Sequence, residues 1–422
     1  MQNLHKIKAL FVISTPAQVA TFDAVLQRHR VGVDPDVDPL FLSLERFYSY
    51  DETHDTLVAI GWPSATLGGT QDYTSLFENP GRKRIKAVVD ARRAVTTLIR
   101  DFSPAVIVLG NDIGAIEKVI IDTARKHRVP TLLVQDGILS ESSAEDYGPQ
   151  PHSIQGYFSL WYKYITRWVL DRAGIISMPN KYGGGGCDRI AAMGPYSREV
   201  LICKGTPPEH IVVTGQPRFD ELVRLSQLPL PGQLDNLCNK RTILFASYWM
   251  SSAFRFVSRE ADLFVMNRLS EVADALCETH QILIRPHPHD NPQDYVMALE
   301  RLGQDKIRVV SEGSLWGHIR CCDLVITYSS TVGIEAVALG KPLVTLSPIS
   351  GIESIPYSQH GVAIFAGNGD SLLRSVEEAL FDQDFRKRFS ESRQSFLEYN
   401  LGAFDGNAGL RVLDLVILMA DH

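Results

Sequence analysis

The sequence is poor in cysteine, and the few cysteines present follow no metal-binding or disulfide pattern. Six occur in 422 residues, at positions 187, 203, 238, 277, 321 and 322. None forms a CxxC pair or stands with histidine at metal-ligand spacing, which argues against a disulfide scaffold and a zinc site. Cys321 and Cys322 adjoin an apolar run, so we expect free buried thiols there and a reducing cytoplasmic setting.

Long apolar runs are also missing. No stretch approaches the about 18 apolar residues of a membrane span. The opening MQNLHKIKALFVIS has a short apolar run without a small-residue cleavage site after it, so we expect a first buried strand rather than a signal peptide. The C-terminal LRVLDLVILMA carries an Arg and an Asp, which favours a packed helix over an anchor.

Basic charge is not in excess either. The chain has 42 Lys and Arg against 49 Asp and Glu, a formal net charge of −7. We therefore expect no nucleic-acid partner bound through a basic surface, although a local basic patch stays open. Hydrophobic residues make up 45% of the chain, as in a globular protein, and 422 residues exceed what one core serves, so two domains are expected.

In the first half, short apolar runs alternate with helical patterns, which is typical of parallel βα units. The predicted strands, nearly continuous in Val, Ile and Leu, are Ala9–Ser14, Pro39–Leu44, Thr56–Ile60, Ala105–Leu109, Thr131–Val134, Arg189–Met193 and Ile211–Thr214. The predicted helices between them are Arg82–Phe102 and Ile116–His127. This half is predicted to be an acceptor-side α/β domain over 1–225, followed by a polar linker over 226–241.

The second half repeats the rhythm after the linker. Its predicted strands are Thr242–Ala246, Gln281–Arg285, Ile307–Val310, Leu324–Thr327, Pro342–Leu346 and Val362–Phe365, and its predicted helices are Glu260–Thr279, Asn291–Leu302, Thr331–Gly340 and Asp370–Phe381. We expect a donor-binding domain over 242–383, with helices over 384–422 packing back on the first domain. The fold class is therefore α/β, with two doubly wound Rossmann-type domains facing across a cleft.

The segment between Ile138 and Gly186 departs from this rhythm. It holds ESSAEDYGPQPHS, an aromatic stretch over Tyr157–Leu170, and the glycine run Gly183–Gly186. The glycines precede a strand and lack the Lys-Ser/Thr of a P-loop, so an active-site loop or linker is favoured over a phosphate cradle. The insertion is long enough for an acceptor-binding lid. Its aromatic stretch is expected to pack into the protein, with a membrane interface as the alternative.

The first chemical motif is ILIRPHPHD, residues 282–290. A buried strand delivers Arg285 and His287 to the sheet edge, and two prolines stiffen the turn. A histidine placed there can donate to a phosphate oxygen of a departing nucleotide. The alternative is a capping or core histidine, and His289 is expected at the surface.

The second motif is DLVITYSSTVGIEAVALGKPLV, residues 323–344. Hydroxyls of Ser329, Ser330 and Thr331 precede a helix, whose N-terminus favours anions. Ser330 or Thr331 could equally be the N-cap. Glu335, one turn into the helix, is a candidate acceptor for a ribose diol or simply complements the helix dipole.

Two further motifs lie at strand ends of the first domain. In TLLVQDGILS, residues 131–140, Asp136 is a candidate general base, while Asp-Gly is also a common turn pair. Asn111 and Asp112 share that predicted edge as candidate acceptor contacts. In HIVVTGQPRFDEL, residues 210–222, Gln216 and Arg218 are candidate donor contacts, although Arg218 could pair with Asp220 at the surface. No His/Glu/Asp set has metal spacing, so no metal is predicted.

Together these motifs resemble GT-B glycosyltransferases of bacterial surface-polysaccharide synthesis. RPHP followed by TYSSTVGIEAVALGKPL is most similar to the group of polysialyltransferases, capsular Kdo transferases and CDP-glycerol glycerophosphotransferases. VTGQPRFDEL is similar to the GxPRxD segment of those enzymes and of non-hydrolysing UDP-N-acetylglucosamine 2-epimerases. The motifs cover about 131 to 345, and the N-terminal third carries none. One departure is Gln135, where the group usually has an acidic residue.

The resemblance implies a metal-independent transfer of a sugar or polyol phosphate from a nucleotide-activated donor to a glycan or lipid-linked acceptor. It favours a CMP- or CDP-linked donor and leaves UDP and GDP open. Asp136 would be the general base and His287 the donor-phosphate ligand. Residues Ser329, Ser330 and Thr331 would make further donor contacts. No tightly bound cofactor is implied, because the nucleotide sugar is a substrate. The expected location is the cytoplasm, with peripheral contact at the inner face of a membrane left open.

Two other functions stay open on the sequence. A sugar-nucleotide 2-epimerase would use the same fold, but TVGIEA differs from the glycine-rich, paired-glutamate stretch associated with epimerases. A non-catalytic protein that binds a nucleotide or glycan would also fit, because the fold alone does not fix the chemistry.

Overall fold

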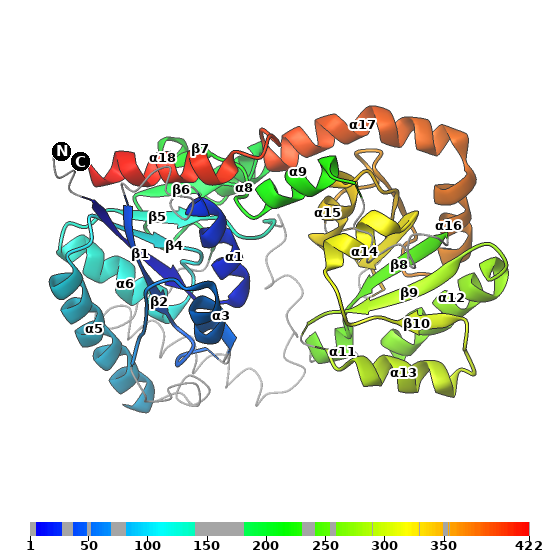
Figure 1. Ribbon diagram of the computed structural model, residues 1–422, viewed down its shortest axis with the longest axis horizontal. Helices are drawn as coiled ribbons and strands as arrows, with labels where there is room; N and C mark the ends of the chain where they lie inside the picture. Colours follow the sequence, from blue (N-terminus) through cyan, green and yellow to red (C-terminus); the bar gives the residue numbers. More distant parts are fainter. Residues whose placement is uncertain are drawn as a thin grey trace, which may run out of the picture. The chain divides into compact units, whose positions relative to one another are not determined.

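The computed structural model describes residues 6–27, 37–48, 52–68, 82–139, 181–229, 241–253, 259–288, 290–328, 330–348, 353 and 355–421. These residues form two compact units (Figure 1). The first contains the described residues up to 139, then 181–221 and 400–421, and the second contains 222–399. Each unit is built around one parallel β-sheet.

The first sheet has seven strands among the described residues. In spatial order they are β3 (Ser64–Thr66), β2 (Val37–Ser43), β1 (Ile7–Ile13), β4 (Val106–Leu109), β5 (Thr131–Val134), β6 (Arg189–Ala192) and β7 (Ile211–Val213). All neighbouring pairs run parallel. Strands β4 and β5 are buried along their whole length, because helices cover both faces of the sheet.

Seven of the helices belong to or begin in the first unit. They are α1 (Pro16–Val25), α3 (Glu52–Ile60), α5 (Arg82–Phe102), α6 (Ala115–Lys126), α8 (Pro195–Cys203), α9 (Phe219–Gln227) and α18 (Ala408–Ala420). The pairs α1 with α18 and α5 with α6 pack against each other, and α18 also contacts β1 and β4. The last helix of the chain is thus part of the first unit.

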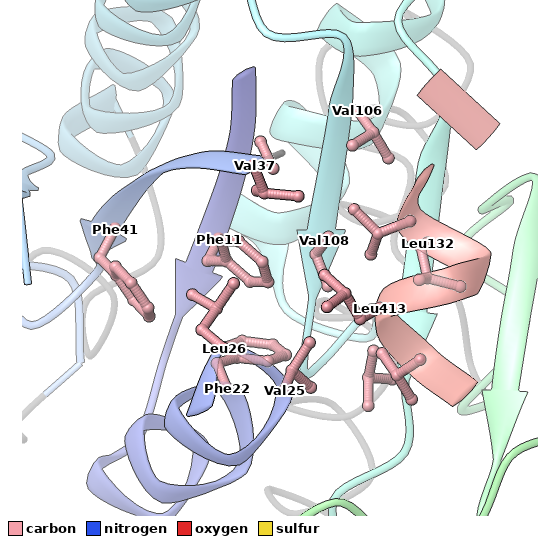
Figure 2. Packing of buried hydrophobic residues seen from close by; sticks show 14 of the residues in the cluster. Phe11, Phe22, Val25, Leu26, Val37, Phe41, Val106, Val108, Leu132 and Leu413 are labelled. Atoms are coloured by element: carbon pink, nitrogen blue, oxygen red, sulfur yellow. The ribbon is translucent and has the colours of Figure 1, made fainter. Parts of the chain in front are cut away.

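The core of the first unit joins residues from both ends of the chain (Figure 2). Phe11 of β1 stacks on Phe41 with ring centroids 5.3 Å apart and meets Phe22 of α1 at the same distance. Leu413 of α18 packs into this cluster beside Val108 of β4. Each fully buried aromatic or leucine side chain contributes about 1.5–3 kcal/mol by leaving water, so α18 is a structural part of this core.

The second sheet has six described strands in an equivalent order. They are β10 (Ile307–Val309), β9 (Gln281–Pro286), β8 (Thr242–Ser247), β11 (Leu324–Tyr328), β12 (Leu343–Leu346) and β13 (Ala363–Phe365), all parallel. Its helices are α11 (Met250–Ala253), α12 (Arg259–Leu276), α13 (Pro292–Arg301), α14 (Leu315–Cys321), α15 (Val332–Ala338), α16 (Leu372–Phe381) and most of α17 (Gln383–Leu401). The predicted pair of doubly wound Rossmann-type α/β domains is therefore confirmed.

One predicted strand is wrong. Residues Thr56–Ile60 lie in helix α3, not in a strand. The β-branched residues favoured a strand, but the buried positions Thr53 and Leu57 are four residues apart while Val58 is 59% exposed. That spacing is helical, and the short strand β3 follows the helix instead.

The cysteine prediction is correct in part. Cys322 is a free and buried thiol. Cys321 instead takes part in a disulfide. The predicted linker over 226–241 stays a prediction, because α9 runs to Gln227 and residues 230–240 lie outside the described residues. None of the helices described is long and apolar enough to cross a bilayer.

Candidate functional site

Each sheet has a point where its strand order reverses, and ligands of doubly wound folds bind outside the carboxyl ends of strands at such points. In the first unit this point lies between β1 and β4, and in the second between β8 and β11. The predicted residues Asn111, Asp112 and Asp136 follow β4 and β5. Residues His287 and Ser330 follow β9 and β11. The predicted residues therefore lie at the carboxyl edges of the two sheets.

Asp136 is held by side chains from two distant segments. The hydroxyl of Thr21 on α1 donates to Asp136 Oδ1 at 2.7 Å. The amide Nε2 of Gln216 donates to the backbone oxygen of Asp136 at 2.7 Å and to Oδ1 at 3.3 Å. Both donors are buried, whereas Asp136 itself is only half-buried. The carboxylate is fixed in orientation and still reachable by a ligand.

The residue before it, Gln135, has a structural role. Its Oε1 accepts the Met193 amide at 2.9 Å, and its Nε2 donates to Ser197 Oγ at 2.8 Å and to the Gly137 oxygen at 2.6 Å. These bonds tie the end of β5 to β6 and α8. A carboxylate at this position has no proton to donate to Ser197 or Gly137, so the amide suits these contacts.

Asp112 holds the glycine run Gly183–Gly186. The predicted lid and the aromatic stretch over Tyr157–Leu170, which precede this run, lie outside the described residues. The Oδ1 of Asp112 accepts the Gly183 amide at 3.1 Å and its Oδ2 accepts the Gly185 amide at 2.7 Å. Burial raises the pKa of the Asp112 carboxyl, and the two amide donors oppose that rise. A Cβ on Gly185 would come within 2.6 Å of the Asp112 backbone oxygen, so only glycine fits there. Asp112 thus anchors this segment rather than pointing freely at an acceptor.

Asn111 joins a buried cluster around Glu117 that the sequence did not reveal. The Asn111 Nδ2 donates to Glu117 Oε1 at 3.1 Å, and the Ser14 hydroxyl donates to the same oxygen at 2.6 Å. The Tyr48 hydroxyl donates to Glu117 Oε2 at 2.5 Å. This cluster joins the ends of β1, β2 and β4 to the first turn of α6, and so it shapes the switch point of the first sheet.

Tyr182 lies over the same edge. Its hydroxyl is 3.4 Å from the backbone oxygens of Gly110 and Val134, at the ends of β4 and β5. Burial raises the pKa of the Tyr182 phenol well above its ordinary value, and the nearby charges of Asp112 and Asp136 raise it further. Tyr182 is therefore a neutral hydroxyl placed near both predicted carboxylates.

The other residues of the GQPRFD motif, 215–220, have different roles. Arg218 is half-buried, with its guanidinium over the ring of Phe219 at 5.3 Å. Asp220 accepts the amides of Ala408 and Gly409 at 2.9 and 2.7 Å, at the start of α18. Of this motif, the residue in contact with Asp136 is Gln216.

In the second unit, Arg285 binds the backbone. Its guanidinium donates to the oxygens of Glu312 and Gly313, both at 2.9 Å, and to that of Val310 at 3.3 Å. Burial lowers the pKa of Arg285. Arg285 thus fixes the loop that leads into α14.

Helix α14 carries that connection to the Ser/Thr motif. Trp316 donates its indole N–H to Glu335 Oε2 at 2.8 Å. His318, buried on the same helix, has a pKa lowered first by burial and then by the charge of Arg285. The structure therefore brings the predicted residues Arg285 and Glu335 together through α14.

His287 is exposed at the end of β9. Its backbone oxygen accepts the Asp290 amide at 2.8 Å. Asp290 in turn accepts the Trp249 amide at 2.9 Å and the Tyr295 hydroxyl at 2.8 Å. The turn after β9 thereby fixes the loop after β8, and it leaves the His287 imidazole accessible at the sheet edge.

The Ser/Thr motif begins α15. The Ser330 hydroxyl lies 3.3 Å from that of Thr327, and the Ser330 backbone oxygen accepts the Tyr357 hydroxyl at 2.6 Å. Thr331 is the N-cap, but its side chain makes no capping hydrogen bond, so it does not need its hydroxyl for the helix. Ser329 and His289 lie outside the described residues. Glu335 is buried against Trp316 rather than exposed.

The residues that sequence reasoning missed are Thr21, Tyr48, Glu117, Tyr182 and His318. Each lies outside a recognisable motif, and each is defined by partners far away in the sequence. Among the described residues, no group of three or more His, Cys, Asp or Glu is placed to hold a metal ion.

Comparison with known proteins supports the fold more than any single activity. No protein-family model matches the chain. A lipid-A-disaccharide synthase from Solibacter usitatus (strain Ellin6076) is 42% identical over 53 residues, which is 13% of this chain and 14% of that relative. The chain therefore matches only a small part of its curated relative.

Solved structures match over nearly the whole chain. A UDP-GlcNAc 2-epimerase from Neisseria meningitidis bound to UDP-GlcNAc has a TM-score of 0.64 at 15% identity, covering 98% of this chain and 100% of that one. The S. aureus MnaA–UDP structure has a TM-score of 0.66 at 14% identity, covering 98% and 97%. A glycosyltransferase from Rickettsia africae ESF-5 has a TM-score of 0.59 at 13% identity, covering 98% and 99%. At these identities the likeness establishes the GT-B-like two-domain α/β fold.

Proposed function

We propose that this protein is a metal-independent glycosyltransferase that moves a sugar from a nucleotide-activated donor to an acceptor hydroxyl. The observation that carries the proposal is Asp136, a half-buried carboxylate at the end of β5 held by Thr21 and Gln216. A fixed carboxylate at a strand end is what a general base for a hydroxyl requires. The similar structures support a nucleotide-sugar substrate, because their names include UDP, UDP-GlcNAc and a glycosyltransferase.

In the proposed reaction, Asp136 accepts the proton of the acceptor hydroxyl. The acceptor oxygen then forms a bond to the anomeric carbon of the donor sugar. The bond between that carbon and the donor phosphate oxygen breaks, and its electron pair leaves with the nucleotide. The negative charge that develops on the departing phosphate needs donors placed in advance.

We assign those donors to the second unit. His287 is exposed at the end of β9, and the hydroxyls of Ser330 and Thr331 lie at the start of α15. A protonated or N–H-donating imidazole, hydroxyls and the backbone amides of a helix start all favour a phosphate. Arg285 and Glu335 would support this set through α14 rather than touch the donor. Ser329 keeps its predicted role as a further donor contact.

The identity of the donor and of the product is the finer part of the proposal. The motif resemblance favours a CMP- or CDP-linked donor and a role in bacterial surface-polysaccharide synthesis, with a glycan or lipid-linked acceptor. The names of several similar structures favour UDP instead. The donor assay must therefore compare all the bases.

A second candidate is a UDP-N-acetylglucosamine 2-epimerase. It is favoured by the number of similar structures that bear this name, including those from Neisseria meningitidis and Rickettsia bellii. An epimerase would invert one carbon of the donor sugar and needs no acceptor. The carboxylate of Asp136 would then exchange a proton with a sugar carbon instead of a hydroxyl.

The test is to incubate the purified protein with CMP-, CDP-, UDP- and GDP-linked sugars, each with and without a pool of glycan acceptors. A transferase releases the nucleotide and extends an acceptor, and both should fall about 100-fold or more in Asp136→Asn. Asp101→Asn, an exposed carboxylate on α5, is the matched control.

The products separate the candidates. Conversion of UDP-GlcNAc to its C2 epimer in the absence of an acceptor would show that the protein is an epimerase and would overturn the transferase proposal. Binding of a nucleotide without transfer, hydrolysis or epimerisation of any donor would favour a non-catalytic binding protein. Unchanged transfer by Asp136→Asn would overturn the assigned mechanism.

A further inference from the structure

A cavity lies in the first unit, at the opposite edge of the sheet from Asp136. It has a volume of about 450 Å³ and is bounded by the end of α6, the starts of β5 and β6, and the last turns of α18. Arg189 opens β6 and Pro130 directly precedes β5, so the cavity adjoins the amino ends of these strands. In a parallel sheet, a ligand bound there cannot also lie at the carboxyl edge, where Asp136 stands.

Three arginines line this cavity: Arg125, Arg128 and Arg189. Arg125 donates to the Gly186 oxygen at 2.8 Å and lies 3.6 Å from Asp122. Arg189 donates to the neighbouring Asp188 oxygen at 3.1 Å. These contacts are to backbone oxygens and to a half-buried carboxylate that Lys118 also binds, so the guanidinium groups keep N–H donors for a ligand.

The acidic residue in the lining is already engaged. Asp188 Oδ2 accepts both the amide and the hydroxyl of Thr131 at 2.8 Å. Among the residues that line the cavity, three arginines and one aspartate give a formal charge of +2, whereas the whole chain carries −7. The cavity therefore favours an anion, and guanidinium groups bind phosphate oxygens well.

The rest of the lining is apolar. Leu415 and Met419 of α18 are buried beneath it, and Leu418 at its rim is 56% exposed. Val129 and Pro130 add partly buried apolar surface. A ligand with both an anionic group and a hydrocarbon part would contact both the arginines and the apolar residues, whereas an inorganic ion would use only the arginines.

A single head group fits this cavity better than a broad anionic surface. Asp414, exposed on α18, lies one turn before Leu418 on the same side of the helix. A flat anionic bilayer pressed against Leu418 would bring this carboxylate against negative charge. One phosphate inserted among the arginines avoids that repulsion.

We propose that this cavity binds an alkyl phosphate, that is, a phosphate group carrying a hydrocarbon chain. The phosphate would lie among Arg125, Arg128 and Arg189, and the chain along Leu415, Leu418 and Met419. Such a group can belong to a soluble phosphate ester or to a lipid, and the test below distinguishes the two. The proposal stands independently of the transferase assignment.

The experiment is calorimetric titration of the full chain with butyl, hexyl and octyl phosphate below their micelle concentrations, and with inorganic phosphate. We expect one saturable site, with affinity rising by up to about fourfold for each methylene that is buried. Arg128→Gln with Arg189→Gln should weaken octyl phosphate binding by about tenfold or more. Arg100→Gln, an exposed arginine on α5, should leave it unchanged.

The substitutions are chosen to spare the fold. Arg128 has a positive φ of 57°. Glutamine at this position keeps the same backbone strain as arginine, whereas glycine would relieve that strain and so change the stability. Leu418→Asn should abolish the gain in affinity with chain length. Val58→Asn, at a residue 59% exposed on α3, is the matched apolar control.

Vesicles identify the source of the phosphate. Binding to phosphatidylglycerol but not phosphatidylcholine vesicles, competed by octyl phosphate and lost in the double arginine variant, would make the source a lipid. Binding of octyl phosphate without vesicle binding would make it a soluble ester. The proposal is overturned if no alkyl phosphate binds, or if the double arginine variant binds octyl phosphate as tightly as the original protein. It is also overturned if inorganic phosphate binds as tightly as octyl phosphate, or if the protein binds vesicles but no alkyl phosphate.

Discussion

At the scale of single residues, the orientation of Asp136 depends on a hydroxyl from α1. The Thr21 hydroxyl donates to Asp136 Oδ1 at 2.7 Å, and Thr21 is only 1% exposed. A hydrogen bond to a charged acceptor contributes about 1.5–3 kcal/mol, so this contact holds the carboxylate in one orientation. Thr21 is therefore a positioning residue for the proposed base.

We expect Thr21→Val to impair catalysis while keeping the fold, because valine has nearly the same shape. Loss of the donor frees the carboxylate from its fixed orientation, so kcat should fall about tenfold or more. Thr21→Ser keeps the hydroxyl and should restore most of the rate. Measured kcat for the two variants decides this, and equal kcat values for Val and Ser would contradict the assigned role.

A second residue-scale prediction concerns His318. Burial and the charge of Arg285 lower the pKa of His318 below its ordinary 6.5, and its Nδ1 has no hydrogen-bond partner among the described residues. The unfolded chain therefore binds a proton that the folded chain resists. The contribution of neutral His318 to stability is present above pH 6.5 and is lost as the pH falls through and below it.

Thermal unfolding should show this contribution. Between pH 7.5 and 5.5, the Tm of the original protein should fall further than that of His318→Gln, which has no proton to gain. A difference of about 2–4 °C corresponds to about 1 kcal/mol for a unit of this size. Equal falls in the two proteins would mean that protonated His318 is accommodated without cost.

The sequence predicted the candidate residues that follow strands, but it did not predict the groups that form hydrogen bonds with them. The residues TLLV before Asp136 form a continuous apolar run, so the carboxyl end of this strand could be predicted. The contact made by Thr21 could not be predicted, because the buried positions of α1 include the polar residues Gln18 and Thr21, which break the apolar periodicity. The anchoring roles of Asp112 and Arg285 were also hidden, since their partners are backbone groups about 71–73 and 25–28 residues away.

At the scale of elements, buried strands were easier to predict than short helices. Strands with both faces covered read as continuous apolar runs, and β5 has the predicted bounds. The amphipathic helix α5 also has its predicted bounds, Arg82–Phe102. The helix α3 was mistaken for a strand because its β-branched residues hide the four-residue spacing of Thr53 and Leu57.

The start of α18 is capped by one carboxylate of the first unit. Asp220 accepts the first two amides of α18, and a Cβ on Gly409 would come within 2.6 Å of the Ala24 backbone oxygen on α1. Burial raises the pKa of Asp220, whereas the two amides lower it. The helix start is thus both capped and closely packed.

We expect Asp220→Ala to destabilise the first unit by about 1–2 kcal/mol, the usual cost of losing an N-terminal cap. Hydrogen exchange should become faster in α18 before it does so in β4 and β5. Asp414→Ala, which removes an exposed carboxylate from the same helix, is the control and should have little effect. Unchanged exchange in Asp220→Ala would show that apolar packing alone holds α18.

At the scale of the whole molecule, the proposed reaction uses protein groups in place of a metal. No cluster of potential metal ligands occurs among the described residues. Because the proposal assigns phosphate stabilisation to His287 and the Ser/Thr hydroxyls, we expect transfer to continue at the same rate after treatment with EDTA. Loss of activity that Mg²⁺ or Mn²⁺ restores would contradict the assignment of phosphate stabilisation to His287 and the Ser/Thr hydroxyls.

The proposed reaction assigns different roles to the two units, each of which has its own sheet. Asp136 belongs to the first unit and His287 to the second, so binding of the nucleotide and activation of the acceptor should fail separately. A bound nucleotide raises the Tm in proportion to RT ln(1 + [L]/Kd), which measures binding without any turnover.

We expect Asp136→Asn to keep the rise in Tm with the preferred nucleotide, tested among CMP, CDP, UDP and GDP, while losing transfer. His287→Ala should lose most of that rise, and His127→Ala, an exposed histidine after α6, should retain it. If His287→Ala kept the full rise and Asp136→Asn lost it, the nucleotide would bind at the first sheet. The roles of the two units would then be exchanged, with the acceptor hydroxyl activated from the second sheet.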